Sequence, residues 1–298
     1  MERKTDMKLG TRLLVLLCLM GAGLIVASIV SVMLPLMGQG LLTMITIQDI
    51  LAFILPAVVA MAIFYRRPWH AMSIDSAPSW PAIVVVVVFF VISMPVMNWL
   101  VNANQAMTLP SWLRGLEQMM RMAEDEAAEA TKQLLDIHSV GEMLACVFVV
   151  GFMAGLSEEM FFRGAMLRTM QDSRLGTHTV VWIVAIIFSA IHLQFYGFIP
   201  RMVLGLWLGY LLVWTRSLWV PIIAHTLNNS TVVVFSYLAN KGIVSENFGD
   251  NIGLPADGGI PWLAILSAVA SITLAIWAHH HFYRQQTPPP LPNTTIPQ

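Results

Sequence analysis

The sequence predicts an all-α fold: a polytopic membrane helical bundle with about eight transmembrane helices. Hydrophobic residues make up 57% of the 298 residues and charged residues only 11%, whereas soluble domains carry about 25% charged residues. The mean hydropathy is +0.71. Because a soluble protein of this size needs more charge to cover its surface, lipid is the simplest solvent for this chain. The formal net charge of −1 provides no basic surface for nucleic acid.

Eight hydrophobic stretches supply the predicted spans, since a helix needs about 20 apolar residues to cross a bilayer. The first is expected to be a membrane anchor and not a signal peptide, because it is too long for a signal h-region and has no clear small-residue cleavage site. The sixth is short. The stretches cover residues 13–37, 41–65, 82–101, 143–168, 178–195, 202–215, 218–239 and 262–279.

The distribution of Lys and Arg predicts that both termini are cytoplasmic, because cytoplasmic loops carry an excess of these residues. Ten lie on the predicted cytoplasmic side and five on the other, with Arg163 left out. The spans are rich in Pro, Met and Trp and the cytoplasmic loops are short, which favours a bacterial plasma (inner) membrane. The ten are Arg3, Lys4, Lys8, Arg12, Arg66, Arg67, Arg168, Arg174, Arg216 and Arg284, and the five are Arg114, Arg121, Lys132, Arg201 and Lys241.

The segment 102–141, between the third and fourth spans, is predicted to be helical. Leu113, Leu116 and Met120 recur at helical spacing and an acidic run follows them. We expect this helix to lie at the membrane interface, with a substrate-binding arm as the alternative. Asp49, near the start of the second span, is also expected at the interface. The proline-rich tail 287–298 is expected to be disordered.

The fourth span carries three ionisable groups within six residues: Glu158, Glu159 and Arg163. Charge inside a bilayer is costly and faces the protein interior where it occurs. Glu159 and Arg163 are four residues apart, so they share a helix face and can pair. Glu158 points about 100° away, which leaves its carboxylate available for proton transfer. The structural alternative is an ion pair that only holds helices together.

Two further spans carry polar residues at compatible depths. The fifth ends in His192, and an antiparallel hairpin would bring His192 to the depth of Glu158, about 20 Å from the turn at ~1.5 Å per residue. The seventh carries His225 and Asn229, which share a face and can donate hydrogen bonds to a developing oxyanion. A lone histidine on an apolar helix is usually a satisfied interior residue, and a His–Asn hydrogen bond between helices is the better explanation of the seventh span taken alone. Taken together, the three spans favour a site.

Several protease mechanisms lack their motifs in this sequence. There is no His-Glu-x-x-His for a zinc metalloprotease, no Gly-x-Ser-Gly of the rhomboid type and no Gly-x-Gly-Asp of the presenilin type. The chemistry that remains is metal-free, general-base hydrolysis of an amide. In it Glu158 and a histidine activate water, and His and Asn hold the oxyanion.

The ordered triplet Glu158-Glu159-x-x-x-Arg163, Phe188-x-x-x-His192 and His225-x-x-x-Asn229 resembles the three motifs of the CPBP (CAAX protease and bacteriocin-processing) family, also called ABI. This family is related to the type II CAAX prenyl endopeptidase. The resemblance covers residues 142–230 and implies a glutamate-dependent intramembrane endopeptidase with eight helices and no metal or other cofactor. By this resemblance Glu158 and His192 activate the water, His225 and Asn229 form the oxyanion hole, and Glu159, Arg163 and Phe188 shape the site or bind substrate.

We therefore expect one integral membrane domain over residues 1–298, with residues 142–230 as its catalytic core. The expected partners are membrane lipids and a peptide or membrane-protein substrate, and the oligomeric state is left open. Three alternatives remain at this point. They are a non-catalytic scaffold or bacteriocin immunity protein of the same fold, a proton-coupled transporter, and a zinc site formed by Glu158, His192 and His225.

Overall fold

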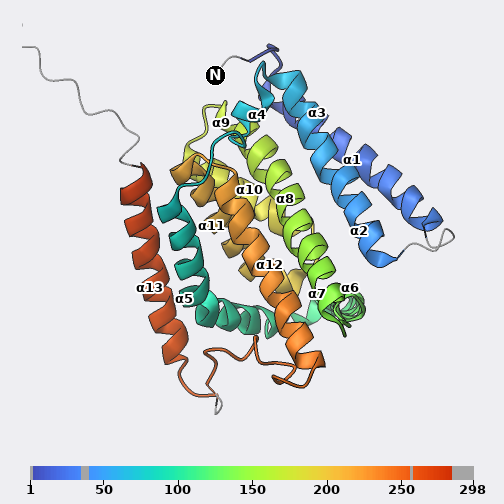
Figure 1. The fold of residues 1–298 in the computed structure, drawn as a ribbon, viewed down its shortest axis with the longest axis vertical. Helices are drawn as coiled ribbons and strands as arrows, with labels where there is room; N and C mark the ends of the chain where they lie inside the picture. The colour runs from blue at the N-terminus through green and yellow to red at the C-terminus, as the bar shows by residue number, and fades with distance from the viewer. Residues whose placement is uncertain (1–2, 35–39, 256–257, 284–298) are drawn as a thin grey trace, which may run out of the picture.

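The structure, a computed structural model, describes residues 3–34, 40–255 and 258–283. Within these ranges the chain forms helices, turns and loops, with a single isolated bridge between Arg3 and Tyr65 and no strand. The predicted all-α helical bundle is confirmed (Figure 1). The predicted disordered tail 287–298 lies outside the described residues, as does the end of the first predicted span.

Each of the eight predicted stretches overlaps a helix or a rod of consecutive helical segments. The second rod joins α2 (Leu41–Asp49) to α3 (Leu55–Phe64) through a π-helical turn at Ile50–Ile54. The fourth, called here the motif rod, joins α7 (Val140–Cys146), α8 (Ala154–Glu159) and α9 (Arg168–Gln171) through π-helical segments at Val147–Met153 and Met160–Leu167. The remaining ones are α1 (Leu9–Met33), α5 (Trp80–Gln105), α10 (Thr177–Ala190), α11 (Phe198–Thr215), α12 (Trp219–Asn240) and α13 (Trp262–Ala278).

Among the described residues, six of these helices or rods are both long enough and apolar enough to cross a membrane. The two others are α10, which is apolar but has only 14 residues, and α12. Although α12 has 22 residues, it carries His225, Asn228 and Asn229 in its middle, and these lower its hydropathy. The expectation of about eight spans thus corresponds to six by length and composition, plus two helices that are short or polar.

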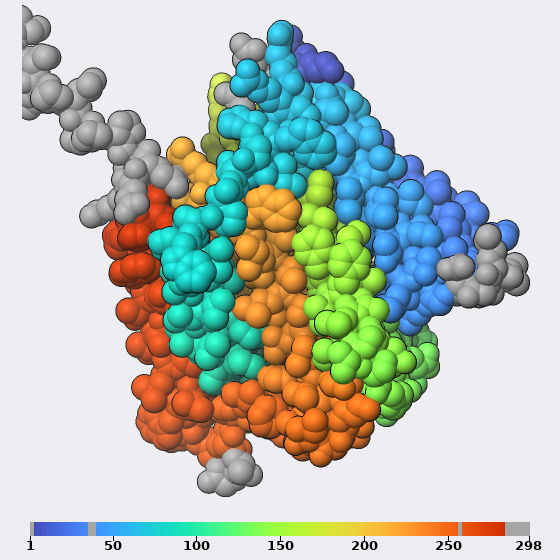
Figure 2. All heavy atoms as spheres, in the orientation of Figure 1, coloured from blue at the N-terminus to red at the C-terminus, as the bar shows by residue number. Residues whose placement is uncertain are grey.

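Helix α12 lies at the centre of the bundle, between α5 and the motif rod (Figure 1). The two N-terminal rods, α1 and α2–α3, pack against the motif rod on one side, and α13 packs against α5 on the other. On the face shown in Figure 2, the surface of α12 is visible between those of α5 and the motif rod. The helix that carries His225 and Asn229 therefore contacts the rod that carries Glu158 and Glu159.

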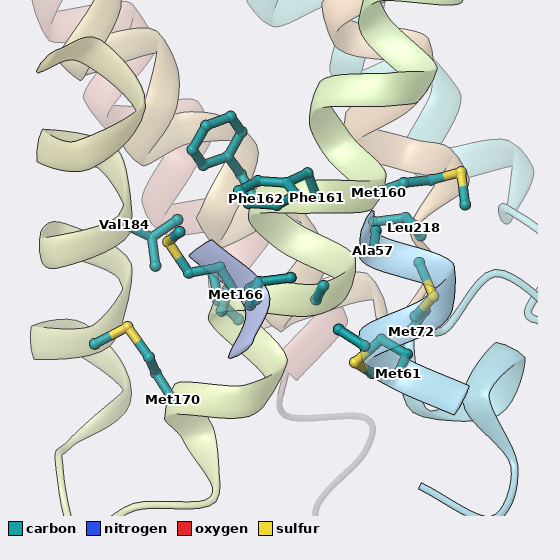
Figure 3. Close-up of a cluster of buried hydrophobic side chains, with 14 of the residues drawn as sticks. Ala57, Met61, Met72, Met160, Phe161, Phe162, Met166, Met170, Val184 and Leu218 are labelled. Carbon is teal, nitrogen blue, oxygen red and sulfur yellow. The ribbon is translucent and has the colours of Figure 1, made fainter. Parts of the chain in front are cut away.

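A core rich in methionine and phenylalanine surrounds the second half of the motif rod (Figure 3). Phe161 and Phe162 are fully buried there, beside methionines from three elements. The flexible thioether side chains of methionine fill irregular gaps, which suits a rod whose π-helical segment Met160–Leu167 departs from regular helical spacing. The methionines are Met61, Met72, Met160, Met166 and Met170.

A polar cluster ties the N-terminal helices to the end of the motif rod. Asp172 accepts hydrogen bonds from Arg12 of α1 at 2.9 Å, from the Tyr65 hydroxyl at 2.7 Å and from Arg168 of α9 at 2.7 Å. Burial alone would raise the pKa of Asp172, but the bonds from Tyr65 and Arg12, together with the Arg168 guanidinium, hold it below its usual value. This cluster fixes one end of the rod that carries the predicted site.

Helix α6 (Arg114–Leu134) lies at the opposite end of the bundle from the N-terminus (Figure 1). The helix predicted within 102–141 is therefore present, although the first residues of that segment continue α5 to Gln105. None of the residues of α6 is buried, and Leu116, Met119 and Met122 are exposed on it. An amphipathic helix with an exposed apolar face is typical of a membrane interface, and its position there stays a prediction.

Candidate active site

Two glycines one turn apart allow the motif rod to approach α12 closely. A Cβ atom at Gly155 would lie 3.0 Å from Thr226 Oγ1 and 3.2 Å from the Thr226 backbone nitrogen. A Cβ atom at Gly151 would overlap the hydroxyl of Ser230. Small residues at i and i+4 are how membrane helices bring their backbones together. The Gly151-x-x-x-Gly155 pair therefore places Glu158 and Glu159, one turn further on, beside His225.

Glu159 is fully buried and receives two charged or polar donors on one oxygen. Arg163 Nη1 donates to Glu159 Oε1 at 2.6 Å, and His225 Nδ1 lies 2.9 Å from the same oxygen. The predicted i,i+4 pair of Glu159 and Arg163 thus forms. The bond to His225 was not predicted, because it depends on how the motif rod packs against α12.

Arg163 is also fully buried and is held by two further groups. Its Nη2 donates to the carbonyl of Gly205 in α11 at 3.0 Å. Its guanidinium lies over the Phe188 ring at 4.5 Å, a cation–π arrangement. The predicted supporting residues Glu159, Arg163 and Phe188 are therefore in contact. They form a buried layer that packs against His225. The His225 ring lies 5.9 Å from the Phe188 ring.

The bond from Glu159 defines which nitrogen of His225 faces the second carboxylate. A carboxylate only accepts hydrogen bonds, so Nδ1 of His225 carries the hydrogen that it donates to Glu159. Nε2 then points toward Glu158, with 3.8 Å between Nε2 and Glu158 Oε2. The Glu158 side chain is 18% exposed, whereas that of Glu159 is completely buried. Of the two neighbouring carboxylates, Glu158 is therefore the one that a substrate or water can reach.

His192 occupies a different backbone setting from the one predicted. Helix α10 ends at Ala190, and Leu193 has a left-handed φ of 55°, so His192 lies in the turn after the helix and not within it. Its Nδ1 lies 2.8 Å from the Phe188 carbonyl. Among the described residues no direct hydrogen bond or ion pair joins His192 to Glu158, and the expectation that the two face each other stays a prediction. His192 instead packs on the Phe188 ring at 5.3 Å, the same ring that His225 contacts.

The segment after His192 is held by α6. The Tyr196 backbone nitrogen donates to Glu124 at 3.3 Å, and the Tyr196 hydroxyl donates to Glu117 at 3.4 Å. Arg121 lies over the Tyr196 ring at 4.3 Å. The hydrogen bond from Arg121 is the main reason why the pKa of Glu117 lies below its usual value. The polar face of α6 therefore helps to fix the turn that carries His192.

Asn229 lies one turn after His225 on α12 and is oriented by two neighbours. Its Nδ2 donates to the Val150 carbonyl at 3.2 Å, and Asn228 Nδ2 donates to Asn229 Oδ1 at 3.2 Å. An amide group has two N–H donors, and one of those of Asn229 remains for another acceptor. The structure thus places Asn229 beside the motif rod with a defined amide orientation.

Asp49 is a buried residue next to this site, and its predicted position at the membrane interface stays a prediction. Only 6% of its surface is exposed, and its Oδ1 lies 3.1 Å from the hydroxyl of Ser157. It is buried because α2 packs against α8 and the segment Val147–Met153. Sequence reasoning could have found it, since a carboxylate inside an apolar run is a functional candidate by default.

Metal binding by Glu158, His192 and His225 requires that the three side chains converge. In the part of the chain that the structure describes, no group of three His, Cys, Asp or Glu side chains is arranged to hold a metal ion.

Comparisons with known proteins identify the class to which this segment is related. Residues 140–231 match the family model described as type II CAAX prenyl endopeptidase Rce1-like. The chain is also 33% identical over 119 residues to the membrane-embedded CAAX protease MroQ of Staphylococcus aureus (strain USA300). The aligned region covers 37% of this chain and 48% of that protein. The chain thus matches about half the length of this curated relative. No solved structure matches the chain.

The matched segment contains the motif rod, α10, α11 and the first half of α12, and with them the predicted site residues. The chain is therefore a relative of the CAAX protease family, and it is an integral membrane protein with several apolar helices. Asp49 and α6 lie outside the segment that matches the family model.

Proposed function

We propose that this protein is a membrane-embedded endopeptidase of the CAAX protease type. It hydrolyses a peptide bond in a membrane-associated or lipidated peptide or protein, by glutamate-dependent chemistry without a metal. The observation that carries this proposal is the buried Arg163–Glu159–His225 chain, which presents His225 Nε2 to Glu158 within the segment related to CAAX proteases. We place the protein in a bacterial plasma membrane with both termini in the cytoplasm.

In this mechanism Glu158 and His192 accept hydrogen bonds from the attacking water. The Phe188 carbonyl only accepts hydrogen bonds, so Nδ1 of His192 donates to it at 2.8 Å, and Nε2 of neutral His192 is left as an acceptor. Glu158 takes the proton as the water oxygen attacks the scissile carbonyl carbon. It then returns the proton to the leaving amine, as general acid–base catalysis requires.

His225 and Asn229 stabilise the oxyanion that forms on the substrate carbonyl oxygen. Because Nδ1 of His225 donates to Glu159, Nε2 can donate to an oxyanion only when the imidazole is protonated. The carboxylates of Glu158 and Glu159 lie on both sides of the ring. The free N–H of Asn229 supplies a second donor, and donors of this kind are worth about 10²–10³-fold in rate.

The proposal is tested by expressing the wild-type protein, Glu158→Gln and His192→Ala in a host without close relatives. The membrane and secreted peptidomes are then compared by mass spectrometry. Cleavage products that depend on the wild-type protein are expected to fall by about 10²–10⁴-fold in Glu158→Gln, because a general base contributes that much. Glu126→Gln, an exposed carboxylate on α6, is the matched control and should leave the products unchanged.

Identical peptidomes for the wild-type protein and Glu158→Gln would overturn the proposal. If both forms then still conferred the same immunity or partner-binding phenotype, a non-catalytic scaffold would be the better description. Metal analysis of the purified, active protein checks the absence of a metal separately.

A further inference from the structure

The N-terminal helices contribute a carboxyl group to the neighbourhood of the site. Asp49 is the last residue of α2, about 90 residues before the segment that matches the family model. Its side chain is buried and contacts the hydroxyl of Ser157, the residue before Glu158. A carboxyl group inside a membrane protein is costly and usually functional, but the mechanism described above does not use Asp49.

Ser157 connects Asp49 to the catalytic carboxylate. The Ser157 hydroxyl is completely buried, lies 3.1 Å from Asp49 Oδ1 and 3.0 Å from the Ala154 carbonyl, and directly precedes Glu158 in α8. It has a single hydrogen for these two acceptors. Both contacts become hydrogen bonds if Asp49 is a neutral acid that donates to Ser157 Oγ, while Ser157 donates to Ala154. The second oxygen of Asp49, Oδ2, is buried without a partner.

We propose that Asp49 is a positioning residue of the active site and acts through Ser157. Its hydrogen bond fixes the rotation of α8, and thereby the direction in which Glu158 points relative to His225 Nε2. The glycine contact with α12 fixes how closely α8 approaches that helix, but not how it turns about its own axis. Asp49 holds α8 from the opposite side, through the packing of α2 against α8. This inference rests on the proposed function of Glu158 as general base.

The test compares two ways of removing the carboxyl group. Asp49→Asn keeps the shape and can still donate a hydrogen bond to Ser157, whereas Asp49→Leu keeps the approximate size and cannot. Ser157→Ala removes the other half of the contact. Thr46→Val is the matched control, because Thr46 lies one turn earlier on α2 and its hydroxyl donates to the Leu42 carbonyl of the same helix. The substrate is a synthetic peptide that spans a cleavage site. The site is chosen because its cleavage product is absent in the Glu158→Gln variant.

We expect Asp49→Leu and Ser157→Ala each to lower kcat per folded molecule by about tenfold or more with KM nearly unchanged, since misplacement by 1 Å can cost about 10²-fold. Asp49→Asn should stay within about threefold of the wild type, and the Asp49→Leu/Ser157→Ala double variant should be no slower than the slower single variant, because residues in one contact are not additive. Thr46→Val should retain the wild-type kcat.

A second measurement needs no substrate. At neutral pH the infrared spectrum should contain a protonated-carboxyl band that Asp49→Asn removes and Ser157→Ala shifts. An unchanged kcat in Asp49→Leu, with a lower melting temperature only, would reduce Asp49 to a structural contact and overturn the inference. The absence of that band would do so as well. If no product depends on Glu158, the proposed function itself fails, and this inference fails with it; if products depend on Glu158 but not on Asp49, only this inference fails.

Discussion

Glu158 and Glu159 are adjacent in the chain but have opposite surroundings. Glu159 is completely buried between Arg163 and His225, with both bonds on one oxygen. Glu158 is partly exposed, and its ionic partner among the described residues, His225 Nε2, is 3.8 Å away, beyond hydrogen-bond length. Glu159 therefore stabilises two buried cationic or polar groups, whereas the Glu158 carboxylate is partly accessible from outside the protein.

This difference predicts opposite results for two conservative substitutions. Glu159→Gln should destabilise the protein by about 3–5 kcal/mol, because it leaves the buried Arg163 charge uncompensated. Glu158→Gln should change the stability by less than about 1 kcal/mol, as most substitutions outside such networks do, and should still abolish cleavage. Thermal unfolding of the detergent-solubilised variants, followed by circular dichroism, measures the first effect. Equal melting temperatures for the two variants would contradict this assignment.

At this scale the sequence predicts contacts within one helix better than contacts between helices. The bond between Glu159 and Arg163 follows from their spacing of four residues. The bond between Glu159 and His225 joins residues 66 positions apart and depends on the packing of the motif rod against α12. For the same reason the contact of Asp49 with Ser157 could not be predicted, since nothing in its local sequence shows that α2 packs against α8. The catalytic roles of Glu158, His192, His225 and Asn229 stay predictions.

Among the elements, the motif rod depends on a close backbone contact. Gly151 and Gly155 face Ser230 and Thr226 of α12, so the site residues of both helices lie within one turn of this contact. A similar pair, Gly205 and Gly209, brings α11 against α10. Because bilayer lipids are as apolar as leucine, such close packing is a main source of attraction between membrane helices.

Gly155→Val should therefore damage both the packing and the activity. Its Cβ atom would approach the Thr226 backbone nitrogen to 3.2 Å, and a backbone atom cannot turn aside. We expect a loss of about 1–3 kcal/mol in stability, typical of overpacking, and a larger loss of activity because Glu158 moves away from His225. Gly21→Val on α1, where a Cβ atom meets nothing within 4 Å, is the control. Equal activity in the two variants would show that this contact does not set the site geometry.

The helix ends and π-helical segments could not be read from hydrophobic periodicity. Residues 178–195 were predicted to be one span, yet α10 ends at Ala190 and the chain turns at Leu193. The turn is stabilised by distant partners, including the Ser189 hydroxyl, which donates to the Phe198 carbonyl at 2.6 Å. Asn104 of α5 also holds this turn, through bonds to Phe195 and Ile199. Periodicity reports which residues are apolar, not where another element stops a helix.

On the scale of the whole molecule, the helical bundle follows from composition, because a chain this apolar must pair its backbone groups within helices when it lies in lipid. The number of spans is less well determined. The polar residues that make α12 a site helix also make it weakly apolar, and α10 is short. Hydropathy therefore identifies a membrane helix least well when that helix carries several polar residues and is packed among other helices.

Among the described residues, basic residues of the predicted cytoplasmic side gather at one end of the fold. Lys4 donates from its backbone to Phe64 at the end of α3, and Leu218 donates to Ser73 in the loop that follows α4 (Pro68–Ala71). The Asp172 cluster lies at the same end, and the Trp214 and His279 rings pack there at 5.7 Å. The N-terminal segment and the C-terminal end of α13 therefore share one end of the bundle, and α6 lies at the other (Figure 1).

This arrangement predicts how the protein is oriented in its membrane. Two single-cysteine variants, Asp75→Cys and Lys132→Cys, are made after Cys18 and Cys146 are replaced by alanine. Both positions are exposed; the first lies in the loop after α4 and the second on α6, two helices at opposite ends of the bundle (Figure 1). A membrane-impermeant maleimide should label Lys132→Cys in intact cells and Asp75→Cys only after permeabilisation, because the basic end stays in the cytoplasm. The reverse pattern would invert the orientation and place α6, with the turn that it holds after His192, on the cytoplasmic side.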